Sequence, residues 1–172
     1  MSHLSNAQLL VIKSAINNAT DSVLIGYRTA NDKPSMAMWF NAPTSPAIIV
    51  WKNSVTVSEV GRAMNSSEVA GLTTANTNRL QVMAAYSGGA FNPSITDVRA
   101  GFDSVFSGAG GTNTRAALLA LYKRTATRFE DLFKTGTGTD ASPATLSTLD
   151  ARGAIIQGTI SSDHIGEALE AV

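Results

Sequence analysis

Apolar residues recur at intervals of three and four along much of the chain, the spacing that places them on one face of an α-helix. The two strongest patterns lie in the second half of the sequence. After Asn92-Pro93, a pair typical of a helix start, the apolar positions are Ile95, Val98, Phe102 and Val105. A second stripe runs from Leu118 to Phe133 and predicts one long helix from Thr112 or Thr114 to about Lys134.

Capping residues support further helices. Ser5 with Gln8 and Thr56 with Glu59 have the spacing of a capping box, in which two side chains satisfy free amides at the start of a helix. The patterns predict shorter helices over residues 5–16, 21–28, 57–64, 73–86 and 162–171. The chain is therefore expected to be mainly α.

Strand signals are few. Ala47–Trp51 is a short apolar run, interpreted as an extended link because no neighbouring strand is obvious. From Gly136 the sequence TGTGTDASPAT holds no large apolar residue, which is typical of a loop or arm. Thr145–Thr148 and Ala154–Ile160 could pair as a hairpin across residues 150–153. We expect a small helical bundle over residues 1–135 and an extended C-terminal arm over residues 136–172, with the hairpin as an option within the arm.

Composition narrows the function classes. The 172 residues include 13 basic and 13 acidic ones, and a neutral chain is poorly suited to wrapping nucleic acid. Charged residues make up 15% of the chain, against about 25% in a typical domain. Two interpretations remain open: a low-charge soluble protein, or a subunit that buries much of its surface against neighbours. Cysteine is absent, no apolar run reaches the roughly 18 residues of a membrane span, and the N-terminus lacks a signal-peptide pattern. The expected location is the cytoplasm or a particle assembled inside the cell.

The sequence presents no constellation for catalysis or for a cofactor. His3 and His164 have no metal-ligand spacing. The carboxylates Asp103, Glu130 and Asp131 are expected on exposed helix positions, where salt bridging or solvation explains them. The Gly-rich stretches lack the lysine and hydroxyl of a phosphate-binding loop. We therefore expect neither an enzyme nor a protein with a bound cofactor or metal.

The long helix also carries a candidate contact surface. Arg124 and Arg128 are four residues apart, so they are expected to share one helix face. That face is either simply solvated or a basic stripe that meets an acidic partner. Trp39, Phe40 and Trp51 are expected in the core, and would be interface anchors if their region lies at the surface.

Three blocks resemble a family of small proteins encoded by tailed bacteriophages and prophages: VWKNSVTVSEVG (Val50–Gly61), FNPSITDVRAGFDSVFSG (Phe91–Gly108) and KRTATRFEDLFKTGTGTDASPATL (Lys123–Leu146). The resemblance covers roughly residues 40–170. It implies a structural virion protein of the head–tail region, similar to head–tail connector (adaptor) subunits that form a ring under the portal protein. It further implies partners in the portal and the neighbouring neck and tail proteins. Genomic DNA would at most pass through the lumen, no membrane would be involved, and the protein would reside in virions assembled in the host cytoplasm.

Alternatives to the connector are a tail-completion, collar or capsid-cementing protein, and a small phage enzyme or DNA-binding regulator. The residues expected to bind a partner lie on the basic stripe and on the arm. They are Arg124, Arg128, Gly136, Gly138, Pro143, Leu146, Ile155, Ile156 and Ile160.

Overall fold

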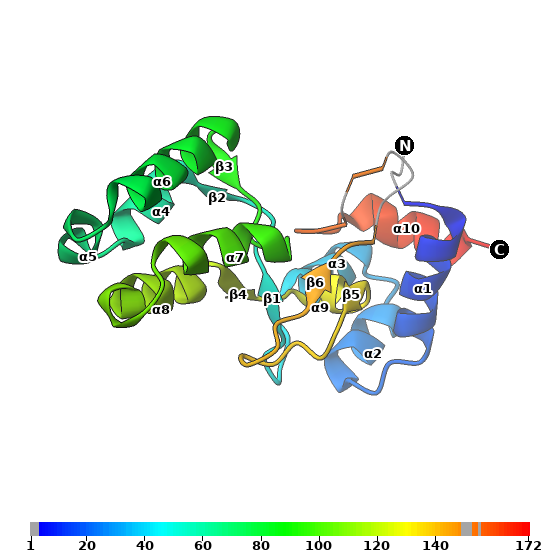
Figure 1. Cartoon of the computed structure of the whole chain (residues 1–172). Helices are drawn as coiled ribbons and strands as arrows, with labels where there is room; N and C mark the ends of the chain where they lie inside the picture. The colour runs from blue at the N-terminus through cyan, green and yellow to red at the C-terminus, as the bar shows by residue number, and fades with distance from the viewer. Residues whose placement is uncertain (1–3, 149–152, 155) are drawn as a thin grey trace. The chain divides into compact units, whose positions relative to one another are not determined.

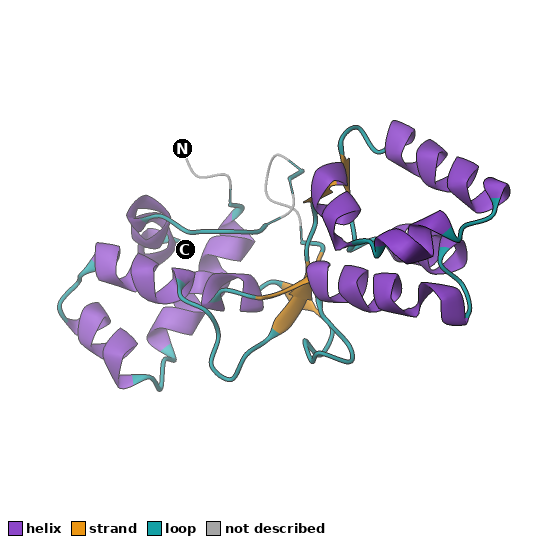
Figure 2. Cartoon of the chain, turned by 90° about the vertical axis from the view of Figure 1, so that its left-hand side faces the viewer, coloured by secondary structure: helices purple, strands orange, loops and turns teal. Residues whose placement is uncertain are grey.

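The structure is a computed structural model that describes residues 4–148, 153–154 and 156–172. The described residues form ten α-helices and a few short antiparallel strand pairs, which confirms the mainly α fold class (Figures 1 and 2). The chain divides into two compact units. The first comprises Met1–Val50 and Thr125–Val172, and the second comprises Trp51–Arg124. This division does not coincide with the expected bundle over residues 1–135 and arm over residues 136–172.

The first unit is built from helices at both ends of the chain. They are α1 (Asn6–Asn17), α2 (Ser22–Thr29), α3 (Lys33–Asn41), α9 (Arg128–Asp131) and α10 (Ser162–Glu170). The predicted capping box at Ser5 and Gln8 is confirmed, and Asp21 and Asp32 cap the next two helices. The core of the unit joins residues from all five helices with Phe133, which follows α9, and with residues of the segment before α10: Ile12, Ile16, Leu24, Met36, Phe40, Phe129, Ile156, Ile160, Ile165 and Ala168.

The C-terminal region is an integral part of this core. Helix α10 packs against both α1 and α3, and Figure 1 shows α10 beside α1. Ile165 and Ala168 on α10 are fully buried. The tail therefore folds back onto the N-terminal helices of its own unit, because its apolar residues find their partners there.

A short hairpin opens the tail. Strand β5 (Lys134–Thr135) pairs antiparallel with β6 (Thr145–Leu146), with Lys134 opposite Leu146. The predicted partner of residues 145–148 was the segment 154–160, whose turn lies partly outside the described residues. The structure differs: Ile156 donates one backbone hydrogen bond to the Thr148 carbonyl, at 2.8 Å, while the ladder is made with β5. Leu146 then packs in a small cluster with Val50, Ala126 and Ala144.

Strand β1 (Ile49–Trp51) corrects the interpretation of residues 47–51 as an unpaired link. It is hydrogen-bonded to β4 (Lys123–Thr125) in a two-stranded sheet. The chain passes into the second unit within β1 and returns within β4. The partner was missed because Lys123–Thr125 was assigned to the long helix.

The second unit contains a two-stranded sheet and five helices. Strand β2 (Val55–Thr56) pairs antiparallel with β3 (Ala90–Phe91). The helices are α4 (Val57–Ala63), α5 (Ser66–Ala70), α6 (Thr74–Tyr86), α7 (Thr96–Val105) and α8 (Thr112–Leu121), with a short 3-10 turn over Ala109–Gly111. The capping box at Thr56 and Glu59 is confirmed. The core consists of Trp51, Val55, Val60, Phe91, Phe102, Val105, Phe106, Leu118 and Tyr122.

Two predicted helices of this region begin or end elsewhere. The helix expected from Asn92 begins at Thr96, because the Asn92 carboxamide accepts hydrogen bonds from the backbone and hydroxyl of Ser94 and holds a turn. Ile95 is consequently 50% exposed. The predicted single helix over residues 112–134 is wrong, because α8 ends at Leu121 and α9 begins at Arg128.

Candidate partner-binding cleft

Arg124 and Arg128, predicted to share one helix face, lie in different units. Arg124 is in β4, and Arg128 is the first residue of α9. The interruption has a local cause: the Thr127 hydroxyl accepts a hydrogen bond from the Glu130 amide, and the Glu130 carboxylate accepts one from the Thr127 amide. This capping box starts a new helix at Arg128 and removes the continuous basic stripe.

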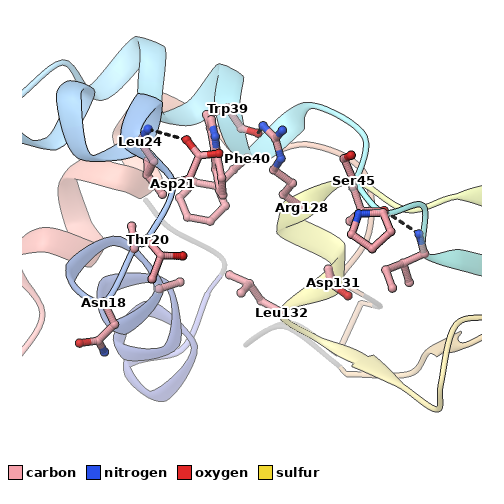
Figure 3. Close-up of a pocket in the computed structure, with 15 residues that line it drawn as sticks. Asn18, Thr20, Asp21, Leu24, Trp39, Phe40, Ser45, Arg128, Asp131 and Leu132 are labelled. Atoms are coloured by element: carbon pink, nitrogen blue, oxygen red, sulfur yellow. Dashed lines mark hydrogen bonds between the residues drawn. The ribbon is translucent and has the colours of Figure 1, made fainter.

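Arg128 lines a cleft of about 540 Å³ within the first unit (Figure 3). The cleft lies between the last turn of α1, the start of α2, the end of α3, the 44–48 segment and α9. Its apolar lining consists of Ala15, Ala19, Leu24, Trp39, Phe40, Pro46, Ile48 and Leu132, and its polar lining of Asn18, Thr20, Asp21, Thr44, Ser45, Arg128 and Asp131.

The Arg128 side chain is held by Trp39. Its guanidinium carbon lies 4.3 Å from the centroid of the Trp39 ring, and a guanidinium nitrogen donates to the Trp39 carbonyl at 3.1 Å. Trp39 in turn meets Phe40 edge to face, with ring centroids 5.0 Å apart. Phe40 is 1% exposed, so the stack is anchored in the core. Stacking on an aromatic ring fixes the plane of a guanidinium and leaves its edges available for further hydrogen bonds.

Two carboxylates complete the charged lining. One oxygen of Asp21 accepts from the amides of Val23 and Leu24, at 2.9 and 3.1 Å, and so caps α2. Asp131 forms an ion pair with Lys134, three residues later. Both carboxylates thus have structural partners within the unit.

Glu130 contradicts the prediction of an exposed position, because its side chain is fully buried. Besides capping α9, its carboxylate accepts a hydrogen bond of 2.6 Å from the Gly158 amide. Asn41 holds the same segment two residues later. Its amide group donates to the Ile160 carbonyl at 2.8 Å and accepts from the Ile160 amide at 2.7 Å. We call this set of bonds from Asn41 and Glu130 to residues 158–160 the tail clamp.

Sequence reasoning missed the tail clamp. The spacing of Thr127 and Glu130 does match a capping box and was available as a signal for a helix start. The bond from Glu130 to Gly158 joins residues 28 positions apart, and those from Asn41 join residues 119 positions apart. No pattern among neighbouring residues of the sequence predicts either contact.

The residues predicted to bind a partner through the arm have diverse positions. Gly136 is exposed and has a positive φ of 104°, at the position that directly follows strand β5. Gly138 is buried against Ile48, and Pro143 is half-buried. Leu146, Ile156 and Ile160 are buried in the first unit, and Ile155 lies outside the described residues. A partner can reach the three buried side chains only by displacing the tail.

The described part of the chain presents neither a cluster of metal ligands nor a membrane-spanning helix. Across residues 4–148, 153–154 and 156–172, no three or more His, Asp or Glu side chains are grouped so as to hold a metal ion. In those same ranges, no helix has the length and apolar character that crossing a bilayer requires.

The comparisons with known proteins give no relative for this arrangement: the chain matches no protein-family model, no curated protein and no solved structure.

Proposed function

We propose that the chain is a structural subunit of a tailed-bacteriophage particle, a head–tail connector that forms a ring between the portal and the tail. The proposal starts from the resemblance of the three blocks Val50–Gly61, Phe91–Gly108 and Lys123–Leu146 to phage and prophage proteins, and the observation that supports it is the set of exposed apolar side chains on a chain with few charges. The first two blocks contribute chiefly to the core of the second unit, and the third contains α9, which lines the cleft.

The surface supports a role in association. Large apolar side chains that are more than a third exposed occur on both units: Leu10, Val11, Val23, Met38, Val69, Val82, Tyr86, Ile95 and Leu119. Met38 is 73% exposed and Tyr86 is 89% exposed. A surface that combines such side chains with only 15% charged residues is poorly protected against association. A subunit that covers these side chains with neighbouring proteins accounts for both features.

The mode of docking differs from that of a free arm. Since residues 156–171 supply core side chains to the first unit, the cleft beside Trp39 and Arg128 is the better docking point for a neighbouring protein. It offers an apolar floor and a fixed cationic group on a single compact unit.

Purification of the full chain, alone and with the portal protein of the same phage, tests the proposal. We expect a closed ring by light scattering and negative-stain microscopy, or ring formation on the portal. A strictly monomeric chain that binds neither portal nor tail would contradict the connector. A tail-completion, collar or capsid-cementing protein is the alternative, and labelling the protein in intact particles distinguishes these positions.

A further inference from the structure

The guanidinium of Arg128 is a fixed and available cation. Arginine carries five N–H donors, and Arg128 uses one nitrogen for the Trp39 carbonyl while its face lies on the Trp39 ring. Among the residues that the structure describes, no carboxylate forms an ion pair with it. A guanidinium held in this way is suited to a bidentate bond with a planar carboxylate, since the cost of ordering it has already been met within the fold.

The other residues that line the cleft indicate which groups of the ligand should lie next to that carboxylate. The buried side chains of Leu24 and Phe40, with the half-buried Leu132, provide an apolar floor. Exposed polar side chains at Asn18, Thr20 and Ser45 can exchange hydrogen bonds with a backbone. An apolar floor with a few polar groups at its edge is typical of a site that takes a polypeptide segment.

We propose that the cleft binds an extended segment of a partner protein, which places a glutamate or aspartate carboxylate on Arg128 and a neighbouring apolar side chain on the floor. The inference rests on the proposed function in that it assumes assembly with other proteins, and it names the chemistry of the docking segment.

The charges of the cleft argue for a carboxylate over a cationic side chain or a nucleic acid. Asp131 is already paired with Lys134, and Asp21 is engaged in capping α2, whereas Arg128 has no anionic partner among the described residues. A nucleic acid would need several cations along its backbone. This cleft offers one, flanked by two carboxylates that would repel a chain of phosphates.

Titration of short peptides onto the full-length, ¹⁵N-labelled protein tests the inference. The probes are the acetylated and amidated peptides Ala-Leu-Glu-Leu-Ala, Ala-Leu-Gln-Leu-Ala and Ala-Leu-Lys-Leu-Ala. The readout is the indole N–H signal of Trp39, assigned by comparison with a Trp51→Phe variant, because nuclear magnetic resonance detects weak binding. We expect the Glu peptide to shift this signal and to bind at least about tenfold more tightly than the Gln peptide, as loss of a charged hydrogen-bond partner predicts.

Two substitutions test the charge preference of the cleft, because one should weaken and the other should strengthen binding of the Glu peptide. Arg128→Gln removes the positive charge and keeps a polar side chain at this position, and it should weaken binding of the Glu peptide by about 10–100-fold. Asp21→Asn retains the cap of α2, since Asn caps as well as Asp, and removes a repelling charge. It should strengthen the Glu peptide by up to about fivefold. Arg62→Gln, on an exposed position of α4 in the second unit, is the matched control and should change nothing.

Each contrary result overturns the proposal. Equal binding of the Glu and Gln peptides, or no shift of the Trp39 signal with the Glu peptide, would rule out a carboxylate as the group that Arg128 binds. Preference for the Lys peptide, with weakening by Asp21→Asn, identifies a cationic occupant instead. If N-acetylglutamate amide binds as tightly as the peptide, the site takes a small carboxylate; if a single-stranded oligonucleotide displaces the peptide, it takes nucleic acid. Ring formation is measured separately, so a chain that forms rings without binding the Glu peptide refutes only this inference.

Discussion

Replacing Asn41 by Ala tests the position of the tail in the first unit. The substitution removes both hydrogen bonds to Ile160, of 2.8 and 2.7 Å, and leaves the buried α3 side chains Met36, Ala37 and Phe40 unchanged. Ile160 is 3% exposed, so water has little access to the amide and carbonyl that lose their partner.

The magnitude follows from the two bonds. Each is worth about 0.5–1.5 kcal/mol net, which gives about 1–3 kcal/mol for the pair. An enclosed backbone group left without a partner costs about 1–3 kcal/mol, so we expect the free energy of unfolding to fall by about 2–4 kcal/mol. That is a large part of the total stability of a small domain, about 5–15 kcal/mol.

Fluorescence can isolate the first unit, because Trp39 lies in the first unit and Trp51 in the second. Urea unfolding of Asn41→Ala in a Trp51→Phe background, followed by Trp39 emission, reports the first unit alone. The matched control is Asn17→Ala, at an exposed position of α1 in the same unit, which should change stability by no more than about 0.5 kcal/mol. If Asn41→Ala behaves like this control, residues 158–160 are not held as described and the tail is a free arm.

Two further substitutions and a pH series test other parts of the structure. Gly138 has a φ of 75°, and a Cβ there would lie 2.5 Å from Ile48 Cγ2. Gly138→Ala should therefore cost clearly more than the about 1 kcal/mol expected for Gly153→Ala, which has a φ of 79° and open space around it; equal losses in urea unfolding would contradict the packing. Hydrogen bonds from Thr114 and Asn113 hold the pKa of Glu68 below its usual value. The unfolded chain thus binds more protons, and stability of the second unit should fall as pH drops below about 4.5. Glu68→Gln should flatten that acid dependence, and an unchanged slope between pH 6 and 3 would refute the role of this carboxylate.

Local patterns predicted those helices whose capping residues and apolar positions lie close together in the sequence. The capping boxes at Ser5 and Thr56, and the apolar residues that follow them, are short-range features, and α1 and α4 occur where expected. The predicted helix boundaries are wrong where a side chain forms a local hydrogen bond that starts or delays a helix. Asn92 turned toward Ser94, and Thr127 paired with Glu130, so one helix began late and another was divided.

The candidate cleft depends on contacts that periodicity does not encode. The sequence indicates Arg128 as a contact residue that shares one helix face with Arg124. In the structure the relevant neighbour is Trp39, 89 residues earlier, whose ring and carbonyl orient the guanidinium. Arg128 could be chosen from the sequence because basic residues cluster around it, whereas the cleft could not be predicted, because residues 15–24, 39–48 and 128–132 build it together.

The role of the tail in the core changes how docking has to be tested. Deleting residues 136–172 would remove Ile156, Ile160, Ile165 and Ala168 from the core of the first unit and would break the tail clamp. Each lost large apolar side chain is worth about 2–5 kcal/mol, so the deletion is expected to unfold the unit. Loss of portal binding in such a variant would then follow from unfolding, even if the tail never touched the portal. Arg128→Gln leaves those buried side chains in place and alters the cleft alone, so it separates docking from folding where the deletion does not.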